Sequence, residues 1–310
     1  MKKFIKKVIL FVLCIGVTVS AFLVFFFTKI SPQYTANYQA SIIDKIARLE
    51  SLESPKIILV GNSNLVYGIN SELIQKEMGM PVVNLGLHGG LGNMFHEDMA
   101  KLNIGEGDIV VVCHTEYADG NSLGNPELTW LTIENHQNLW KIIRPDDVGA
   151  LLTGLPSYVL KASYYWITGE EDHTVINYNQ RVMFNEYGDN IYPREEQVFE
   201  FGPDVVKVPE INDNFITRIN EFYAYCNEKG ADLVLAGYPI ADGEYTPPAE
   251  DYRKFQEELE QRLECEVISD FTDYMFPYDM FFNTYLHLTT EGAEIRSKQL
   301  VEDLKLYLEE

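Results

Sequence analysis

Two segments at opposite ends of the chain carry residue types that together could perform nucleophilic chemistry. Ser63 lies in the sequence Gly61-Asn62-Ser63-Asn64, directly after an apolar run, and His287 lies close to the C-terminus. A serine hydroxyl is a weak nucleophile until a base accepts its proton, and imidazole is the side chain most often used for this. Each residue alone is also explained by a turn or a helix cap. The pairing of the two segments is what points to acyl chemistry at a serine.

The local pattern places Ser63 beyond the end of a parallel strand. Residues 56–60, KIILV, form a short apolar strand, and residues 70–79 form a helix that begins with Asn70 and ends at Gly79. In an open parallel sheet, ligands bind outside the carboxyl ends of the strands. The small neighbours of Ser63 permit a tight turn, and N–H groups at a helix start can stabilise developing negative charge.

Apolar strands and helices alternate through most of the chain. We predict further strands at 82–87, 108–113, 231–237 and 266–269, and helices at 93–102, 212–229, 249–263 and 290–308. Continuously apolar strands separated by helices indicate a parallel sheet that is covered on both faces, and hence an α/β fold.

The middle section, at about 125–208, interrupts this alternation. It is rich in Trp and Tyr, and then in Asn, Asp and Gly around residues 185–190. We interpret it as helices followed by an irregular insertion over the end of the sheet. Its aromatic side chains fit either a core or a ligand platform, and the core is the commoner use. They are Trp130, Trp140, Tyr158, Tyr164, Tyr165 and Trp166.

The N-terminus predicts a membrane anchor. Residues 8–27 contain no charge and no proline, and 20 helical residues span about 30 Å, the thickness of a hydrocarbon core. Four lysines precede this run and only Lys29 follows closely, so the positive-inside bias places the N-terminus in the cytoplasm and the body outside. A cleaved signal peptide is the alternative. We expect a tip and anchor at 1–30, a stalk at 31–54 and one α/β domain at 55–310.

Charge and cysteine content exclude several classes of function. The chain has 24 basic and 47 acidic residues and a net charge of −23, with five lysines and no acid among the first 30 residues. Nucleic acid is excluded as a partner because phosphate binding needs a basic surface. Residues 86–92, GLHGGLG, match neither a phosphate-binding loop nor a dinucleotide fingerprint, and no zinc spacing is present. We expect no metal and no cofactor, and a buried free thiol at Cys113.

Several short blocks resemble the SGNH/GDSL hydrolase superfamily. Residues 60–70, VGNSNLVYGIN, look like its first block, residues 83–86 like its second, and His287-Leu288-Thr289-x-x-Gly292 like its last. Residues 107–111 followed by Glu116-Tyr117 are similar to a membrane-anchored bacterial branch, which includes proteins of teichoic acid D-alanyl transfer and of alginate O-acetylation. The resemblance covers most of 55–120 and 230–309. It implies a flavodoxin-like three-layer α/β/α sandwich with a parallel sheet.

The resemblance also assigns roles to residues. Ser63 would be the nucleophile, His287 the base, and the N–H groups of Ser63 and Gly86 the oxyanion hole. The family's third block supplies a further donor from an Asn in Gly-x-Asn-Asp, but His114-Thr115-Glu116 stands there, which leaves Asn84 or Asn93 as candidates. The remaining pocket candidates are Asn62, Asn84, His88 and Glu116.

The residue that should orient the base also departs from the family pattern. The family has Asp three residues before the histidine, where this chain has Thr284, and in the anchored branch Asp is expected one place earlier, where it has Asn283. An amide can orient imidazole but cannot stabilise imidazolium by charge. Asn283 is therefore the expected orienter, unless Asp273 or Asp279 replaces it.

The resemblance, together with the predicted anchor, implies two alternative functions. The first is an extracytoplasmic serine esterase or O-acyltransferase that acts on a cell-envelope glycan or teichoic-type polymer through an acyl-serine. The second is a catalytically weak or inactive scaffold or binding protein in a polymer-acylation or assembly complex. The partners expected are a cell-surface polymer or acyl donor, and a membrane-bound acyltransferase.

Overall fold

A five-stranded parallel sheet organises the body of the protein. In the computed structural model, which describes residues 1–118, 123–170 and 177–309, the strand order is β2-β1-β3-β4-β6. This is the doubly wound order in which a ligand crevice forms beside the first strand. A second sheet pairs β5 with β7 in parallel. The strands are β1 (Ile57–Gly61), β2 (Val82–Asn84), β3 (Ile109–Cys113), β4 (Asp232–Leu235), β5 (Ile240–Asp242), β6 (Glu266–Val267) and β7 (Met275–Pro277).

Helices cover both faces of the main sheet. Ile57 and Leu59 of β1 face one layer and Ile58 and Val60 the other, because successive strand residues point to opposite faces. One layer contains α3 (Ser63–Gly68), α4 (Ser71–Met78) and α10 (Thr290–Glu309). The other contains α2 (Ile42–Ser51), α5 (Asn93–Ala100), α8 (Asp213–Glu228) and α9 (Ala249–Arg262). The expected α/β class with a parallel sheet covered on both faces is confirmed.

Local capping signals in the sequence are realised in the structure. The Asn70 side chain accepts a hydrogen bond from the Leu73 N–H at 3.0 Å and begins α4, and Gly79, with φ of 68°, ends it. Cys113 is fully buried and its thiol is free, as expected. The predicted stalk at 31–54 is different, because it belongs to the folded body. Ile42, Ile46 and Leu49 of α2 are fully buried against the sheet.

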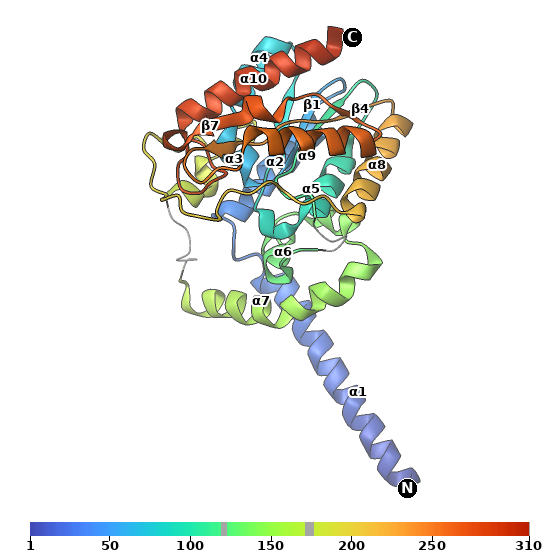
Figure 1. Ribbon diagram of the computed structural model, residues 1–310. Helices are drawn as coiled ribbons and strands as arrows, with labels where there is room; N and C mark the ends of the chain where they lie inside the picture. The colour runs from blue at the N-terminus through green and yellow to red at the C-terminus, as the bar shows by residue number, and fades with distance from the viewer. Residues whose placement is uncertain (119–122, 171–176, 310) are drawn as a thin grey trace.

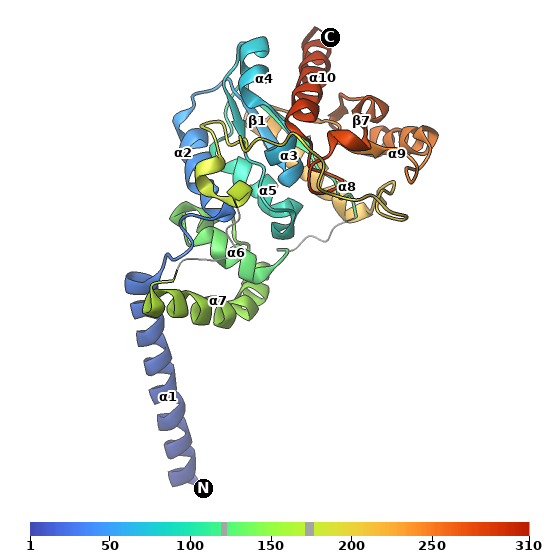
Figure 2. The same ribbon diagram turned by 90° about the vertical axis from the view of Figure 1, so that its left-hand side faces the viewer.

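The N-terminal helix projects away from this body. Helix α1 (Lys2–Phe25) has no buried residue and continues through a π-helical turn, Phe26–Ile30. Within the described residues, this is the single helix long and apolar enough to cross a membrane. Figures 1 and 2 both show α6 (Pro126–Ile133) and α7 (Val148–Thr168) between the body and α1.

The insertion at about 125–208 consists of these two helices followed by irregular chain. Residues 171–176 of this insertion lie outside the described part. The aromatic side chains divide, since Trp130 and Tyr158 are buried in the core whereas Trp140, Tyr164 and Trp166 are exposed. Neither use proposed for these side chains describes the whole set.

Candidate active site

Ser63 is the first residue of α3 and follows β1 across a one-residue turn. A Cβ on Gly61 would lie 2.7 Å from the carbonyl oxygen of Cys113 on the neighbouring strand, so only glycine fits at the end of β1. Asn62 begins the helix, because its Oδ1 accepts the Asn64 N–H at 3.0 Å. This short connection places the Ser63 hydroxyl at the carboxyl end of the sheet, as the sequence predicts.

His287 lies at the end of a tight loop that leads into α10. Phe281 and Leu288 form an antiparallel bridge, and the Phe282 N–H donates to the His287 carbonyl at 2.8 Å. The Thr284 hydroxyl accepts the His287 N–H at 3.1 Å. These bonds close the loop so that the side chains of Asn283 and His287 face each other.

Ser63, His287 and Asn283 form one hydrogen-bonded array. His287 Nε2 lies 2.8 Å from Ser63 Oγ, and His287 Nδ1 lies 2.7 Å from Asn283 Oδ1. Because the amide oxygen only accepts, Nδ1 must carry the imidazole proton. Nε2 is then unprotonated and accepts the Ser63 hydroxyl proton, as a general base does. Asp273 and Asp279 are both exposed, and Asn283 occupies the position they would need.

The surroundings of His287 keep its imidazole neutral. Burial, together with the nearby charge of Arg194 and with His88, lowers the pKa of His287 to about 3. The Tyr67 ring covers the imidazole, with centroids 4.4 Å apart. A neutral ring is ready to accept a proton. The imidazolium formed on reaction, however, has no carboxylate to stabilise it, because its partner is an amide.

The loop at Asn84 and Gly86, which was expected to contribute to the oxyanion hole, forms hydrogen bonds within the protein instead. The Gly86 N–H donates to Asn84 Oδ1 at 2.9 Å. Asn84 is fully buried, and its amide donates to Leu65 O at 3.0 Å and to Asp189 Oδ1 at 2.8 Å. Within the described residues, the Ser63 N–H has no hydrogen-bond partner. One of the two predicted donors is therefore free, and the other is engaged.

Asn93, the other candidate donor, and two further polar side chains near the strand ends have hydrogen-bond partners of their own. The Asn93 amide donates to the Glu116 carbonyl at 2.8 Å. His114, at the position of the family's third block, is fully buried and lies 2.9 Å from Glu97. Asn62 is buried and donates to the Thr115 hydroxyl at 2.7 Å. Each of these side chains therefore has a hydrogen-bond partner other than Ser63.

A cavity of about 560 Å³ opens in front of Ser63, a volume suited to a small ligand or one end of a polymer. Its lining includes His88, one of the pocket candidates from the sequence. The remaining walls come from the segment after α1 and from α6 and α7, so the insertion does cover the site. Lining residues include Tyr34, Tyr38, Ser63, Tyr67, His88, Leu128, Leu131, Lys161, Tyr165, Asn283 and His287.

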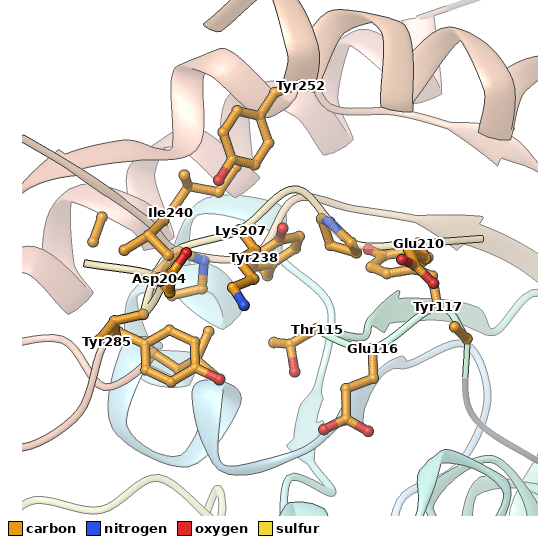
Figure 3. A pocket seen from close by; sticks show the side chains of 17 residues that line it. Thr115, Glu116, Tyr117, Asp204, Lys207, Glu210, Tyr238, Ile240, Tyr252 and Tyr285 are labelled. Atoms are coloured by element: carbon orange, nitrogen blue, oxygen red, sulfur yellow. The ribbon is translucent and has the colours of Figure 1, made fainter. Parts of the chain in front are cut away.

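Glu116, the remaining pocket candidate, borders a different cavity. This second cavity, of about 480 Å³, borders the same loop through Tyr285 and is also lined by Thr115 and Lys207. Figure 3 shows Tyr285 and Thr115 at its border, with Glu116 beside Thr115. Glu116 is therefore not beside Ser63, although Thr115 connects the two regions through its bond with Asn62.

Two buried arginines that support the site were not predicted. Arg296 is fully buried on α10 and donates to both the carbonyl and the side-chain oxygen of Asn64 at 2.9 Å. Arg194 donates to Leu288 O at 3.0 Å and to Tyr67 O at 3.1 Å. The burial of Arg296 could have been predicted from the sequence, because it shares a helical face with Leu300 and Leu304. Arg194 lies in irregular chain, where no such spacing indicates burial.

Comparisons with protein-family models, with characterised proteins and with solved structures found no match to this chain. The class that the fold and site define is thus an α/β protein with a Ser-His-Asn array at the carboxyl edge of a parallel sheet. Membership of the SGNH superfamily stays a prediction from the short sequence blocks.

Proposed function

We propose that this protein is a membrane-anchored serine esterase or O-acyltransferase of the SGNH type, which acts on a cell-envelope polymer. The observation that carries the proposal is the array in which Ser63, His287 and Asn283 are joined at 2.8 and 2.7 Å. The strand order and the cavity in front of Ser63 support it. The chemistry needs no metal or cofactor.

The reaction would proceed through an acyl-serine. Ser63 Oγ attacks the ester or thioester carbonyl while its proton moves to His287 Nε2. The tetrahedral oxyanion is held by the Ser63 N–H, and by the Gly86 N–H once that group leaves Asn84. The proton on His287 passes to the departing alcohol or thiol. A water or polymer hydroxyl then gives its proton to His287 and attacks the acyl-serine. As the bond between the acyl carbon and Ser63 Oγ breaks, His287 returns the proton to Ser63 Oγ and the free serine is restored. Hydrolysis and transfer differ only in this acceptor.

The location proposed for this reaction is the outer side of the cell membrane. Helix α1 would be the single membrane span, with Lys2, Lys3, Lys6 and Lys7 on the cytoplasmic side. An outward-facing domain tied to the membrane is within reach of envelope glycans and teichoic-type polymers. The proposed partners are such a polymer or acyl donor, and a membrane-bound acyltransferase.

A second function, a scaffold or binding protein for polymer acylation, is favoured by one specific observation. The Gly86 N–H is engaged by Asn84 Oδ1, and Asn283 provides no charge for the imidazolium. A site with these two features would bind an ester group and react with it slowly.

A fluorophosphonate probe distinguishes the two functions. The full chain in detergent micelles should be labelled on Ser63, with no labelling of Ser63→Ala and a rate lowered at least about 100-fold in His287→Ala, because general base catalysis is worth about that much. Ser51→Ala, at the exposed end of α2, is the matched control and should label normally. If well-folded protein is not labelled, the enzyme proposal fails and the scaffold function stands.

A further inference from the structure

The outer face of α7 carries a row of apolar side chains that the described chain leaves uncovered. Leu152, Leu160 and Ile167 are 55%, 71% and 74% exposed. Residues three or four positions apart lie on the same face of a helix, so these side chains and the apolar residues between them form one row. The whole row is Val148, Leu152, Pro156, Leu160, Tyr164 and Ile167. The sole charged residue of α7, Lys161, pairs instead with Glu127 on α6.

The inner face of α7 is apolar as well. Leu151, Tyr158 and Ala162 are buried in the core shared with α6. The polar side chains Ser157 and Lys161 lie between these two faces and bond to Glu127, and a helix with apolar side chains over most of its surface is normally covered there by protein or by lipid. Helix α7 is not apolar enough to cross a membrane, and within the described residues only the N-terminal helix is both long enough and apolar enough to do so. Its outer face therefore needs an apolar cover that does not require the helix to span.

Helix α7 is fixed to the end of α1. The Phe25 ring packs edge-on against Trp166 with centroids 6.1 Å apart, and the Phe26 ring packs against Tyr158 at 5.4 Å. The Tyr158 hydroxyl lies 2.9 Å from the Ser31 hydroxyl. Figures 1 and 2 both show α7 lying across the end of α1, on the side of the body from which α1 leaves.

We propose that the outer face of α7 lies in the headgroup region of the bilayer that α1 crosses. An interfacial helix buries its apolar face about 5–10 Å into the boundary between headgroups and acyl chains, and Trp and Tyr concentrate at the headgroup level. Tyr164 and Trp166 of α7 are 51% and 47% exposed. The occupant is lipid because α1 brings this helix to the membrane. The inference rests on the proposed anchor and does not depend on reactivity at Ser63.

This placement fixes where the active site lies. Lys161 and Tyr165, on the opposite side of α7, line the cavity in front of Ser63. A helix is about 10–12 Å across with its side chains. The cavity is thereby held about one helix diameter from the lipid headgroups, where it meets substrates at the membrane surface before those in bulk solvent.

Nitroxide depth measurements on the full chain test this placement. The protein is reconstituted in phosphatidylcholine–phosphatidylglycerol vesicles, and a spin label is placed at Leu160→Cys or Ile167→Cys in a Cys14→Ser background. Cys113, Cys226 and Cys265 are buried and stay unlabelled. The matched control is Lys254→Cys on the exposed face of α9, in the same background. In a separate sample of the natural protein, a label on the exposed Cys14 reports the depth of α1. Oxygen probes lipid and a nickel chelate probes water.

The labels on α7 should show an oxygen-to-nickel collision ratio at least several-fold above that of the α9 label. If they match α9 while Cys14 lies in hydrocarbon, the α7 inference is wrong and the anchor stands. If Cys14 itself is in water, the anchor fails and the inference with it. Dipolar broadening between α7 labels would show that a second copy covers this face, which also overturns the inference. Fluorophosphonate labelling of the same samples reports on Ser63 separately.

Discussion

Ser63 lies between the base side of the site, formed by His287 and Asn283, and the loop side, formed by the segment that carries Gly86. The hydrogen bonds on the base side suit the reaction as they stand, whereas on the loop side the Gly86 N–H already has a partner within the protein. On the base side, the Ser63 hydroxyl faces His287 Nε2, which would take its proton, and His287 Nδ1–H donates to Asn283 Oδ1, which fixes the tautomer of the base. On the loop side, the Gly86 N–H donates to the Asn84 side chain.

The difference separates two requirements of acyl transfer. Proton removal needs a base held in the correct tautomer, which the array provides without a ligand. Charge stabilisation needs donors aimed at the oxyanion, and one such donor is worth about 100- to 1,000-fold in rate. Only the Ser63 N–H is free for this purpose among the two predicted donors. The loop side is therefore where we expect the reaction to be limited.

The largest effect is expected from filling the space beside Gly86. A Cβ at Gly86 would lie 2.9 Å from each of Asn62 O, Asn84 Oδ1 and Leu65 Cβ. Relief of this overlap must move the turn that presents Ser63. Gly86→Ala should lower the free energy of unfolding by about 2–3 kcal/mol and the rate of fluorophosphonate labelling by about 100-fold. Denaturant unfolding and labelling kinetics measure the two.

Gly149→Ala is the matched control for this prediction. Gly149 lies in the first turn of α7, and a Cβ there has no heavy atom within 4 Å. The change should leave labelling unchanged and raise stability by up to about 1 kcal/mol, since alanine is the better helix former. Normal labelling of folded Gly86→Ala would show that the loop does not constrain Ser63.

Asn283→Asp tests the base side of the site by placing a carboxylate beside His287. Asn283→Asp should raise the labelling rate by about 10- to 100-fold, because the charge stabilises the imidazolium. This is less than the roughly 10⁴-fold effect of an Asp-to-Asn change that also gives the wrong tautomer. Asp279→Asn, at an exposed position near the same loop, is the control and should change nothing. A rate that stays the same or falls would mean that Asn283 does not face His287 during reaction.

The pH profile should change with the same substitution. His287 acts as a base only when neutral, so labelling falls as the pH drops through its pKa. In the natural protein that pKa is about 3, so the rate should be flat through the mildly acidic range. In Asn283→Asp the carboxylate raises the pKa toward the ordinary 6.5, and an acid limb should appear within that range. Rate measurements across this range check the shift.

The sequence was informative where signals are local. Helix α4 between Asn70 and Gly79, and the apolar strands of the main sheet, depend on neighbouring residues and were predicted well. The segment at 31–54 was misread because its polar residues outnumber its apolar ones, although Ile42, Ile46 and Leu49 have the spacing of a buried helical face.

The hydrogen bonds of Asn84 and Gly86, on the loop side of Ser63, could not be predicted from the sequence. The orientation of Asn84 is set by Asp189, from the insertion, and the buried Lys45 ammonium donates to the Asn84 carbonyl at 2.9 Å. These partners are distant in sequence and meet only in the folded chain. The array of Ser63, His287 and Asn283 was predictable in membership, but its hydrogen bonds depend on a loop closed by Thr284.

The smallest predicted effect concerns the loop that carries Gly86. Asn84→Ala removes the acceptor of the Gly86 N–H and should raise the labelling rate per folded molecule by about 3- to 10-fold, less than a full oxyanion donor provides. It should also lower stability by about 1–3 kcal/mol, because Asp189 and Leu65 O lose a donor. Asn93→Ala removes a comparable bond, to Glu116 O, and should lower stability without raising the rate. If Asn84→Ala labels more slowly than the natural protein at equal folded fraction, Asn84 holds the loop in its working form, and the Gly86 N–H is not the missing donor.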